Sequence, residues 1–82
     1  MELSLIKGQF TAEDSLELLN QLVQVKIRFH ENQIKAGAEE EDVRMRESRI
    51  SELQRELADI RKKIMSGDSR VEMNAVVEFY QS

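Results

Sequence analysis

The sequence predicts a mainly α-helical fold, an antiparallel two-helix hairpin flanked by short N- and C-terminal β-strands (β-α-α-β) and completed by homodimerisation. Two long segments carry apolar residues at alternating spacings of three and four, which is typical of packed helices. A short segment containing Gly37 separates them. At both ends of the chain the apolar residues instead tend to alternate with polar ones, which is typical of strands.

Length and composition restrict the chemistry of the chain. Its 82 residues are enough for a single domain, 1–82, with a small core. The composition is 40% hydrophobic, 34% charged and 5% aromatic with no proline, which favours helix over disorder. The absence of cysteine excludes disulfides and thiolate metal clusters, and a single histidine excludes a multi-histidine zinc site within one chain. Most of the catalytic chemistry of small domains is thereby excluded.

Residues typical of strand and helix ends indicate where the first strand and the first helix begin and end. Residues 2–7 mix apolar and polar side chains, and we expect a short strand there that Gly8 ends. We expect a helix over 12–36, capped by Thr11, whose side chain accepts a hydrogen bond from the backbone of Asp14. Gly37 can adopt a positive φ and therefore suits the end of this helix.

The second helix is expected over 39–66 and the second strand over 70–80. Four consecutive acids stand at the start of this helix and three consecutive bases near its end, as the helix dipole prefers. After it, apolar residues occupy every second position, so that they share one face of an extended chain. This apolar strand face consists of Val71, Met73, Ala75, Val77 and Phe79.

Folding the chain about Ala38 sets the two helices in register. Leu19 then lies opposite Leu57. In the same register His30 lies opposite Arg46, and the short turn agrees with an antiparallel hairpin. The predicted hairpin seam consists of Leu16, Leu19, Val23, Ile27, His30, Arg46, Ile50, Leu53, Leu57, Ile60 and Ile64.

The first helix carries a second apolar line, about 140–180° around the helix from the seam. The second helix is mostly polar outside its seam and cannot cover both lines, although burying the second one would contribute on the order of 6–12 kcal/mol. The C-terminal strand lying over the first helix from Leu18 toward Phe29 is one cover, and a second copy of the chain is another. Because an isolated two-stranded ribbon is marginally stable, we expect a homo-oligomer. The predicted oligomer interface consists of Leu18, Leu22, Val25, Phe29, Val71, Met73, Val77 and Phe79.

His30 and Glu31 begin like the HExxH helix of zinc proteases, which requires a second histidine one turn later. Ile34 stands at that position, so we expect no metal site within one chain, and a site shared across an oligomer stays open. We interpret His30 as a polar member of the seam, where protonation beside Arg46 is repelled. Arg46 itself fits a polar residue that fixes the alignment of the seam.

Residues 44–63 carry seven bases against four acids, which raises the alternative of a nucleic-acid-binding face. The interleaved acids, the lack of aromatic residues in this helix and the net charge of −4 disfavour nucleic acid as a partner. The sequence contains no glycine-rich phosphate loop and no set of paired catalytic groups on a recognisable scaffold. We therefore expect no enzymatic activity and no catalytic, cofactor-binding or metal-binding residues.

The expected function is a non-enzymatic protein-interaction or scaffolding module that acts as a homodimer or tetramer. The alternative is a small nucleic-acid-associated regulator that uses the basic face of the second helix. The N-terminus lacks the features of a secretory signal, and no apolar run is long enough to span a bilayer. We therefore expect a cytoplasmic protein without a membrane, cofactor or small-molecule partner, and leave a second protein partner open.

Overall fold

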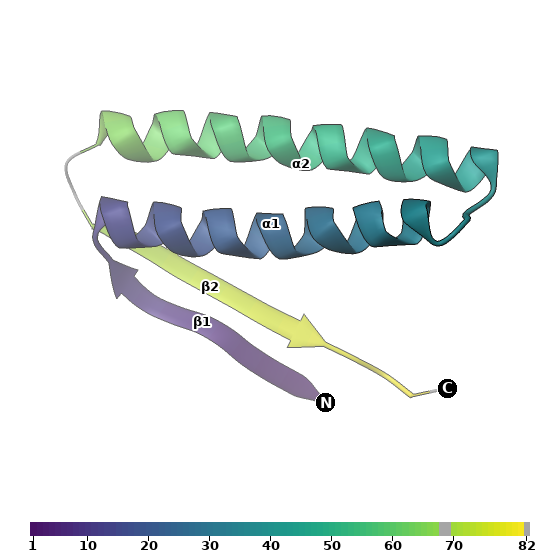
Figure 1. Cartoon of the computed structure of the whole chain (residues 1–82). Helices are drawn as coiled ribbons and strands as arrows, with labels where there is room; N and C mark the ends of the chain where they lie inside the picture. Colours follow the sequence, from purple (N-terminus) through teal and green to yellow (C-terminus); the bar gives the residue numbers. More distant parts are fainter. Residues whose placement is uncertain (68–69, 82) are drawn as a thin grey trace.

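A computed structural model describes residues 1–67 and 70–81 of the chain. The helices lie antiparallel beside each other, and the strands form a ribbon that starts near one end of the helix pair (Figure 1). The predicted β-α-α-β order is confirmed. In chain order the elements are β1 (Glu2–Phe10), α1 (Ala12–Lys35), α2 (Glu40–Ser66) and β2 (Val71–Glu78).

Both ends of α1 have the predicted terminating residues, Thr11 at the N-terminus and Gly37 after the C-terminus. Thr11 Oγ1 accepts a hydrogen bond of 3.1 Å from the backbone nitrogen of Asp14, which satisfies one of the free donors of the first turn. At the other end the backbone nitrogen of Ala36 donates to the carbonyl of Asn32, and Gly37 follows with φ of 92°. The helix ends at Lys35, one residue before its predicted end, because Ala36 serves as the cap.

The second helix begins one residue later than predicted and ends at the predicted residue. Glu39 has extended backbone angles, φ −65° and ψ 156°, and is therefore the cap before Glu40. The acids of the first turn lie at the positive end of the helix dipole. At the C-terminus, Ser66 Oγ donates to the carbonyl of Lys63 at 2.9 Å.

The two strands differ from their predicted bounds, and Gly8 does not end β1. The strand continues to Phe10, three residues further, because its pairing with β2 continues through Gly8 opposite Met73 to Phe10 opposite Val71. Gly8 has φ of +140°, a backbone conformation that favours glycine. Glycine therefore allows the backbone to depart from regular strand angles at this position while the strand continues. The second strand is shorter at both ends than the predicted 70–80.

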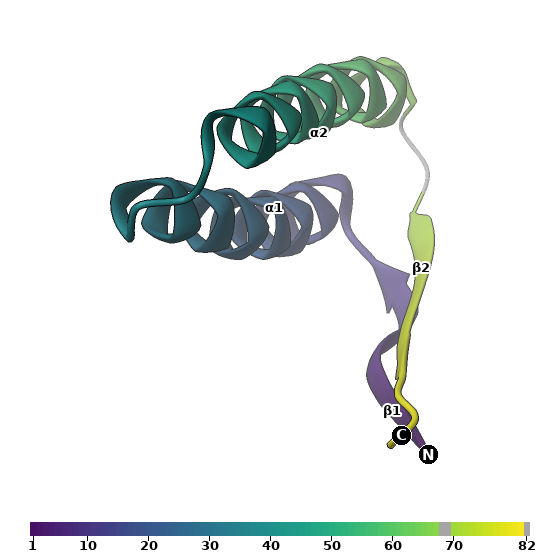
Figure 2. The same cartoon turned by 90° about the vertical axis from the view of Figure 1, so that its right-hand side faces the viewer.

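The ribbon projects away from the helix pair. Figure 2 shows both strands leaving the hairpin on one side, with the two chain ends together at the far end of the ribbon. Of the two possible covers for the second apolar line of α1, the one in which β2 lies over the helix from Leu18 toward Phe29 is therefore wrong. The two strands hydrogen-bond to each other over nearly their whole length. The direction of the ribbon is therefore set by the pairing of the strands and not by packing along α1.

The core of one copy is small. Among the described residues, the buried apolar side chains are those of Ile6, Ile27, Leu57 and Met73. Ser15 in the first turn of α1 is fully buried, and its hydroxyl donates to the carbonyl of Ala12 at 2.8 Å, so its burial leaves no unpaired hydroxyl. Neither helix, both described in full, has an apolar stretch of the length that crossing a bilayer requires.

Candidate interaction surface

The face of α1 that carries the predicted seam lies against α2. Ile27 and His30 of α1 and Leu57 of α2 are buried, whereas Ile60 is partly exposed. The structure gives intermediate burial to the remaining seam residues, which are Leu16, Leu19, Val23, Arg46, Ile50, Leu53 and Ile64. Within the hairpin, the seam is therefore best buried around its middle and toward the turn.

The second apolar line of α1 is covered unevenly along its length. Leu18 and Leu22, in the first half of the helix, are half-buried. Val25 and Phe29, in the second half, are 63% and 49% exposed. Removing large apolar side chains from water lowers the free energy of the protein. This exposed half of the line is therefore a candidate contact surface.

The ribbon has one apolar face and one polar face, and a β-bulge extends the apolar one. Ile6 pairs with Ala75, but the pairing shifts by one residue at Leu5, so that Leu3 pairs with Val77. Without this extra residue the strict alternation of a strand would place Ser4 on the apolar face in place of Leu3. Strict alternation of side chains, which would place Leu3 and Leu5 together on the face opposite to Ile6, therefore does not hold in this strand.

The apolar face of the ribbon is covered near the helices and open further out. Ile6 and Met73, in the inner half, are buried. Leu3, Val77 and Phe79, in the outer half, are 53%, 44% and 45% exposed. Two of the predicted interface residues, Val71 and Met73, thus lie in the inner half and are partly or fully covered within one copy.

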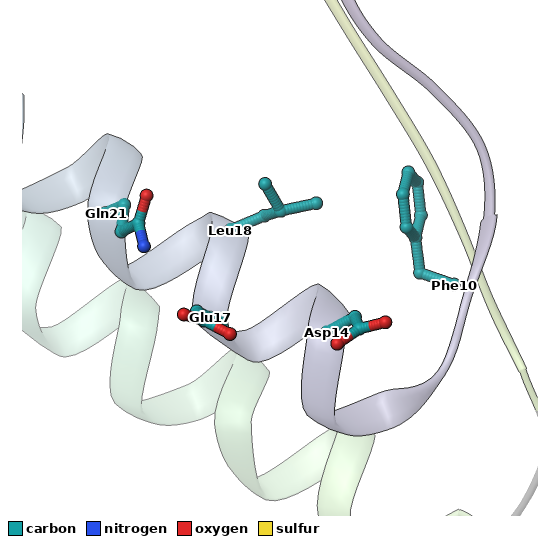
Figure 3. Close-up of a pocket in the computed structure, with 5 residues that line it drawn as sticks. All are labelled: Phe10, Asp14, Glu17, Leu18 and Gln21. Carbon is teal, nitrogen blue, oxygen red and sulfur yellow. The ribbon is translucent and has the colours of Figure 1, made fainter.

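The outer face of α1 and the ribbon meet in an open cleft. One part, of about 260 Å³, is lined by Leu5 and Ile6 of β1 and by Leu18, Leu22 and Val25 of α1, together with Gln21. Its neighbour, of about 290 Å³, lies nearer the start of α1. In Figure 3, Leu18 projects from the helix into the space in front of the Phe10 ring, while Asp14 and Glu17 stand beside it. Sequence analysis missed the contribution of Leu5, because the bulge that turns this residue toward α1 depends on strand pairing.

A second cluster surrounds His30 near the turn of the hairpin. Arg46 Nη1 lies 3.1 Å from His30 Nδ1, as the sequence register predicts, and Arg46 Nε donates to Asp42 at 3.0 Å. Because arginine only donates, Nδ1 is the acceptor and the proton of the neutral ring is assigned to Nε2. Among the described residues, Nε2 has no hydrogen-bond partner.

The surroundings of His30 oppose its protonation. Burial lowers the pKa of His30 from its ordinary value of 6.5, and the positive charges of Lys26, Arg46 and Arg49 lower it further, whereas Asp42 acts in the opposite direction. The neutral ring is therefore the form that suits the folded hairpin. It packs edge-on against Phe29 at a ring separation of 5.9 Å.

We expect the stability of the hairpin to fall on mild acidification. The folded chain takes up a proton at His30 less readily than the unfolded chain, so the free energy of unfolding is highest above pH 6.5 and falls as the pH drops toward the lowered pKa. Urea denaturation at a series of pH values measures this. The variant His30→Gln keeps an acceptor for Arg46 and should have a flatter profile, and equal slopes in both proteins would contradict the assignment to His30.

Among the described residues, three ion pairs join charged side chains of α2, the partly buried pair of Arg46 with Asp42 and two that are exposed. Arg44 lies 2.9 Å from Glu40, and Arg49 lies 2.8 Å from Glu52. Exposed pairs of this kind contribute little to stability. They neutralise part of the charge in the first half of α2, and the surplus of bases over 44–63 remains.

Because an exposed ion pair contributes little to stability, Glu52→Ala should change the free energy of unfolding by less than about 0.5 kcal/mol. Thermal denaturation at low and moderate salt checks the expectation. A loss several times larger would mean that the Arg49 and Glu52 pair takes part in a contact beyond its own helix.

The cluster around His30 does not gather the ligands of a metal. Over 1–67 and 70–81, no three His, Cys, Asp or Glu side chains lie together in an arrangement that could hold an ion. Comparison of the chain with models of protein families, with curated proteins and with solved structures found no match.

Proposed function

We propose that the chain is a cytoplasmic, non-enzymatic interaction or scaffolding module that works as a homo-oligomer. The observation that carries this proposal is the amount of surface that one copy leaves in water. Much of its apolar part lies on the outer face of α1, which borders the cleft, and on the outer half of the ribbon, which lies beyond it. Association that buries both supplies the core that a single copy lacks.

The accessible surface of one copy is too large for a compact monomer. It measures 6770 Å², whereas a globular protein of 9.6 kDa exposes about 5,100 Å². The surplus of about 1,700 Å² per copy exceeds the roughly 800 Å² that each partner buries in a standard interface and lies in the range of obligate homodimers. Its size therefore supports a permanent assembly over a transient contact.

The shape of the chain supports the same proposal. The radius of gyration is 15.3 Å, whereas a compact domain of 82 residues has a radius of about 12 Å. The molecule measures 45 × 31 × 13 Å, and its smallest dimension allows little more than one layer of packed elements. A second copy laid against the open side would add the missing layer.

The mass of the purified chain in solution tests the proposal. Light scattering during size-exclusion chromatography should give at least twice 9.6 kDa, and the value should persist on tenfold dilution if the assembly is permanent. A constant mass of one copy over the whole concentration range, with native helix content, would contradict it.

A further inference from the structure

We propose that two copies pack antiparallel along the outer face of α1, with the two-fold axis crossing the helices near residues 23 and 24, and that each ribbon reaches over onto the second copy. This inference rests on the proposed function and adds the partner, its direction and its register. The occupant of the cleft is thus the α1 helix of a second copy.

The direction follows from the uneven coverage of α1. The ribbon leaves the hairpin near the start of α1 (Figure 1). Val25 and Phe29, in the far half of the helix, stay exposed. An antiparallel second helix brings its own exposed half beside the start of the first helix, where the cleft and the ribbon lie. A parallel second helix would leave the two exposed halves together at the end that has no ribbon.

The register follows from the spacing of the apolar residues. Leu18, Leu22, Val25 and Phe29 are separated by four, three and four residues, which is the repeat of an antiparallel helical seam. Placing Leu18 opposite Phe29 of the second copy also places Leu22 opposite its Val25. The two-fold axis repeats both pairs, so all four side chains of each copy are matched in one arrangement.

The charges beside this seam are complementary in the same register. Asp14, Gln21, Arg28 and Lys35 follow one another at intervals of seven and therefore form a row along one flank of the apolar line. In an antiparallel helix pair with this seam, the row of one copy lies beside the same row of the second copy, and the two rows run in opposite directions. Asp14 then stands within about 3 Å along the axis of the position of Lys35 in the second copy, at a rise of 1.5 Å per residue. The acidic end of each row thus meets the basic end of the other.

The outer half of the ribbon supplies the second part of the interface. Figure 2 shows the ribbon running away from its own helices toward the chain ends. In the proposed dimer, the α1 helix of the second copy lies against the apolar face of its outer half, where Leu3, Val77 and Phe79 are exposed. The bulge at Leu5 acquires a role in this arrangement, because it continues the apolar face beyond the part that the chain's own helix covers.

Cross-linking of introduced cysteines tests the arrangement, and the chain offers a clean background because it has no cysteine. Asp14 and Lys35 are exposed and lie outside the apolar line, so that replacing them leaves the packed side chains intact. We compare Asp14→Cys, Lys35→Cys and the double variant, each treated with a bismaleimide whose span is about 8–10 Å. A second double variant, Asp14→Cys with Glu52→Cys on α2, serves as the control for random collision.

The expected result is a covalent dimer of the first double variant and little cross-linking of the other three. Along the helix axis, two copies of residue 14 are about 28 Å apart in the proposed register, two copies of residue 35 about 34 Å, and residues 14 and 35 of one copy about 31 Å. None of these distances fits the cross-linker, whereas residue 14 of one copy and residue 35 of the other do. Far-UV circular dichroism shows that each variant is folded.

Two outcomes would overturn the inference in distinguishable ways. If the chain has the mass of a dimer, and either a single variant cross-links efficiently or the first double variant does not, the antiparallel register is wrong and the proposed function stands. If the chain is a folded monomer, the antiparallel register and the proposed homo-oligomer are both wrong. The cleft would then have to bind a different partner.

Discussion

Val25→Glu should convert the assembly into folded single copies. Val25 is 63% exposed in one copy, so a glutamate there is solvated and leaves the hairpin intact. In the dimer the same residue lies in the apolar seam, where a carboxylate loses its hydration without gaining a partner. The two-fold axis puts this change into the interface twice, so we expect association to weaken by at least about 3 kcal/mol, more than a hundredfold in Kd. Light scattering and circular dichroism together measure mass and helix content.

A matched substitution on the other side of the ribbon serves as the control. Val76 is exposed, but it pairs with Ser4 and lies on the polar face. Val76→Glu should therefore retain the wild-type mass. The related change Leu22→Glu should also lower the mass, although this half-buried residue carries a greater risk of unfolding. The interface assignment would fail if Val25→Glu and Val76→Glu had the same mass as the wild type.

Leu57→Ala should remove much of the stability of the hairpin. Within α2, all of whose residues are described, Leu57 is the buried one, and it faces the seam of α1. Truncating a buried leucine to alanine costs about 2–5 kcal/mol, because the transfer free energy is lost and a cavity remains. The whole net stability of a chain of this length is roughly 4–12 kcal/mol. A large fall in the midpoint of urea denaturation is therefore expected.

Met65→Ala on the same helix gives the comparison. Met65 is exposed, so its truncation should change the free energy of unfolding by no more than about 0.5 kcal/mol. Both variants are measured at the same protein concentration, because unfolding of an oligomer depends on concentration. A similar midpoint for Leu57→Ala and Met65→Ala would mean that the hairpin seam contributes little to folding.

The helices and their pairing could be predicted because their causes are local. Thr11 caps α1 through an atom three residues away, and Gly37 allows the turn by its own conformational freedom. Once the turn is short, an antiparallel hairpin has little choice of register. His30 and Arg46 therefore meet as predicted, although 16 positions separate them in the chain.

The ribbon could be predicted only in outline. Alternation of side chains indicates a strand but gives neither its partner nor an irregularity in the pairing. The shift at Leu5, the continuation of β1 through Gly8 and the divergence of the ribbon from α1 all depend on hydrogen bonds between the two ends of the chain. The burial of Ser15 had no signal in the sequence, since a small polar residue in a first helical turn is ordinarily exposed.

The sequence by itself determined the two helices, their caps, their turn and the surplus of apolar residues on α1, because each depends on neighbours within a few residues or on a short connection. Only the tertiary structure decided that the ribbon covers the first half of that surplus and leaves Val25 and Phe29 in water. The direction of a ribbon follows from strand pairing, twist and bulges, which are interactions between distant segments.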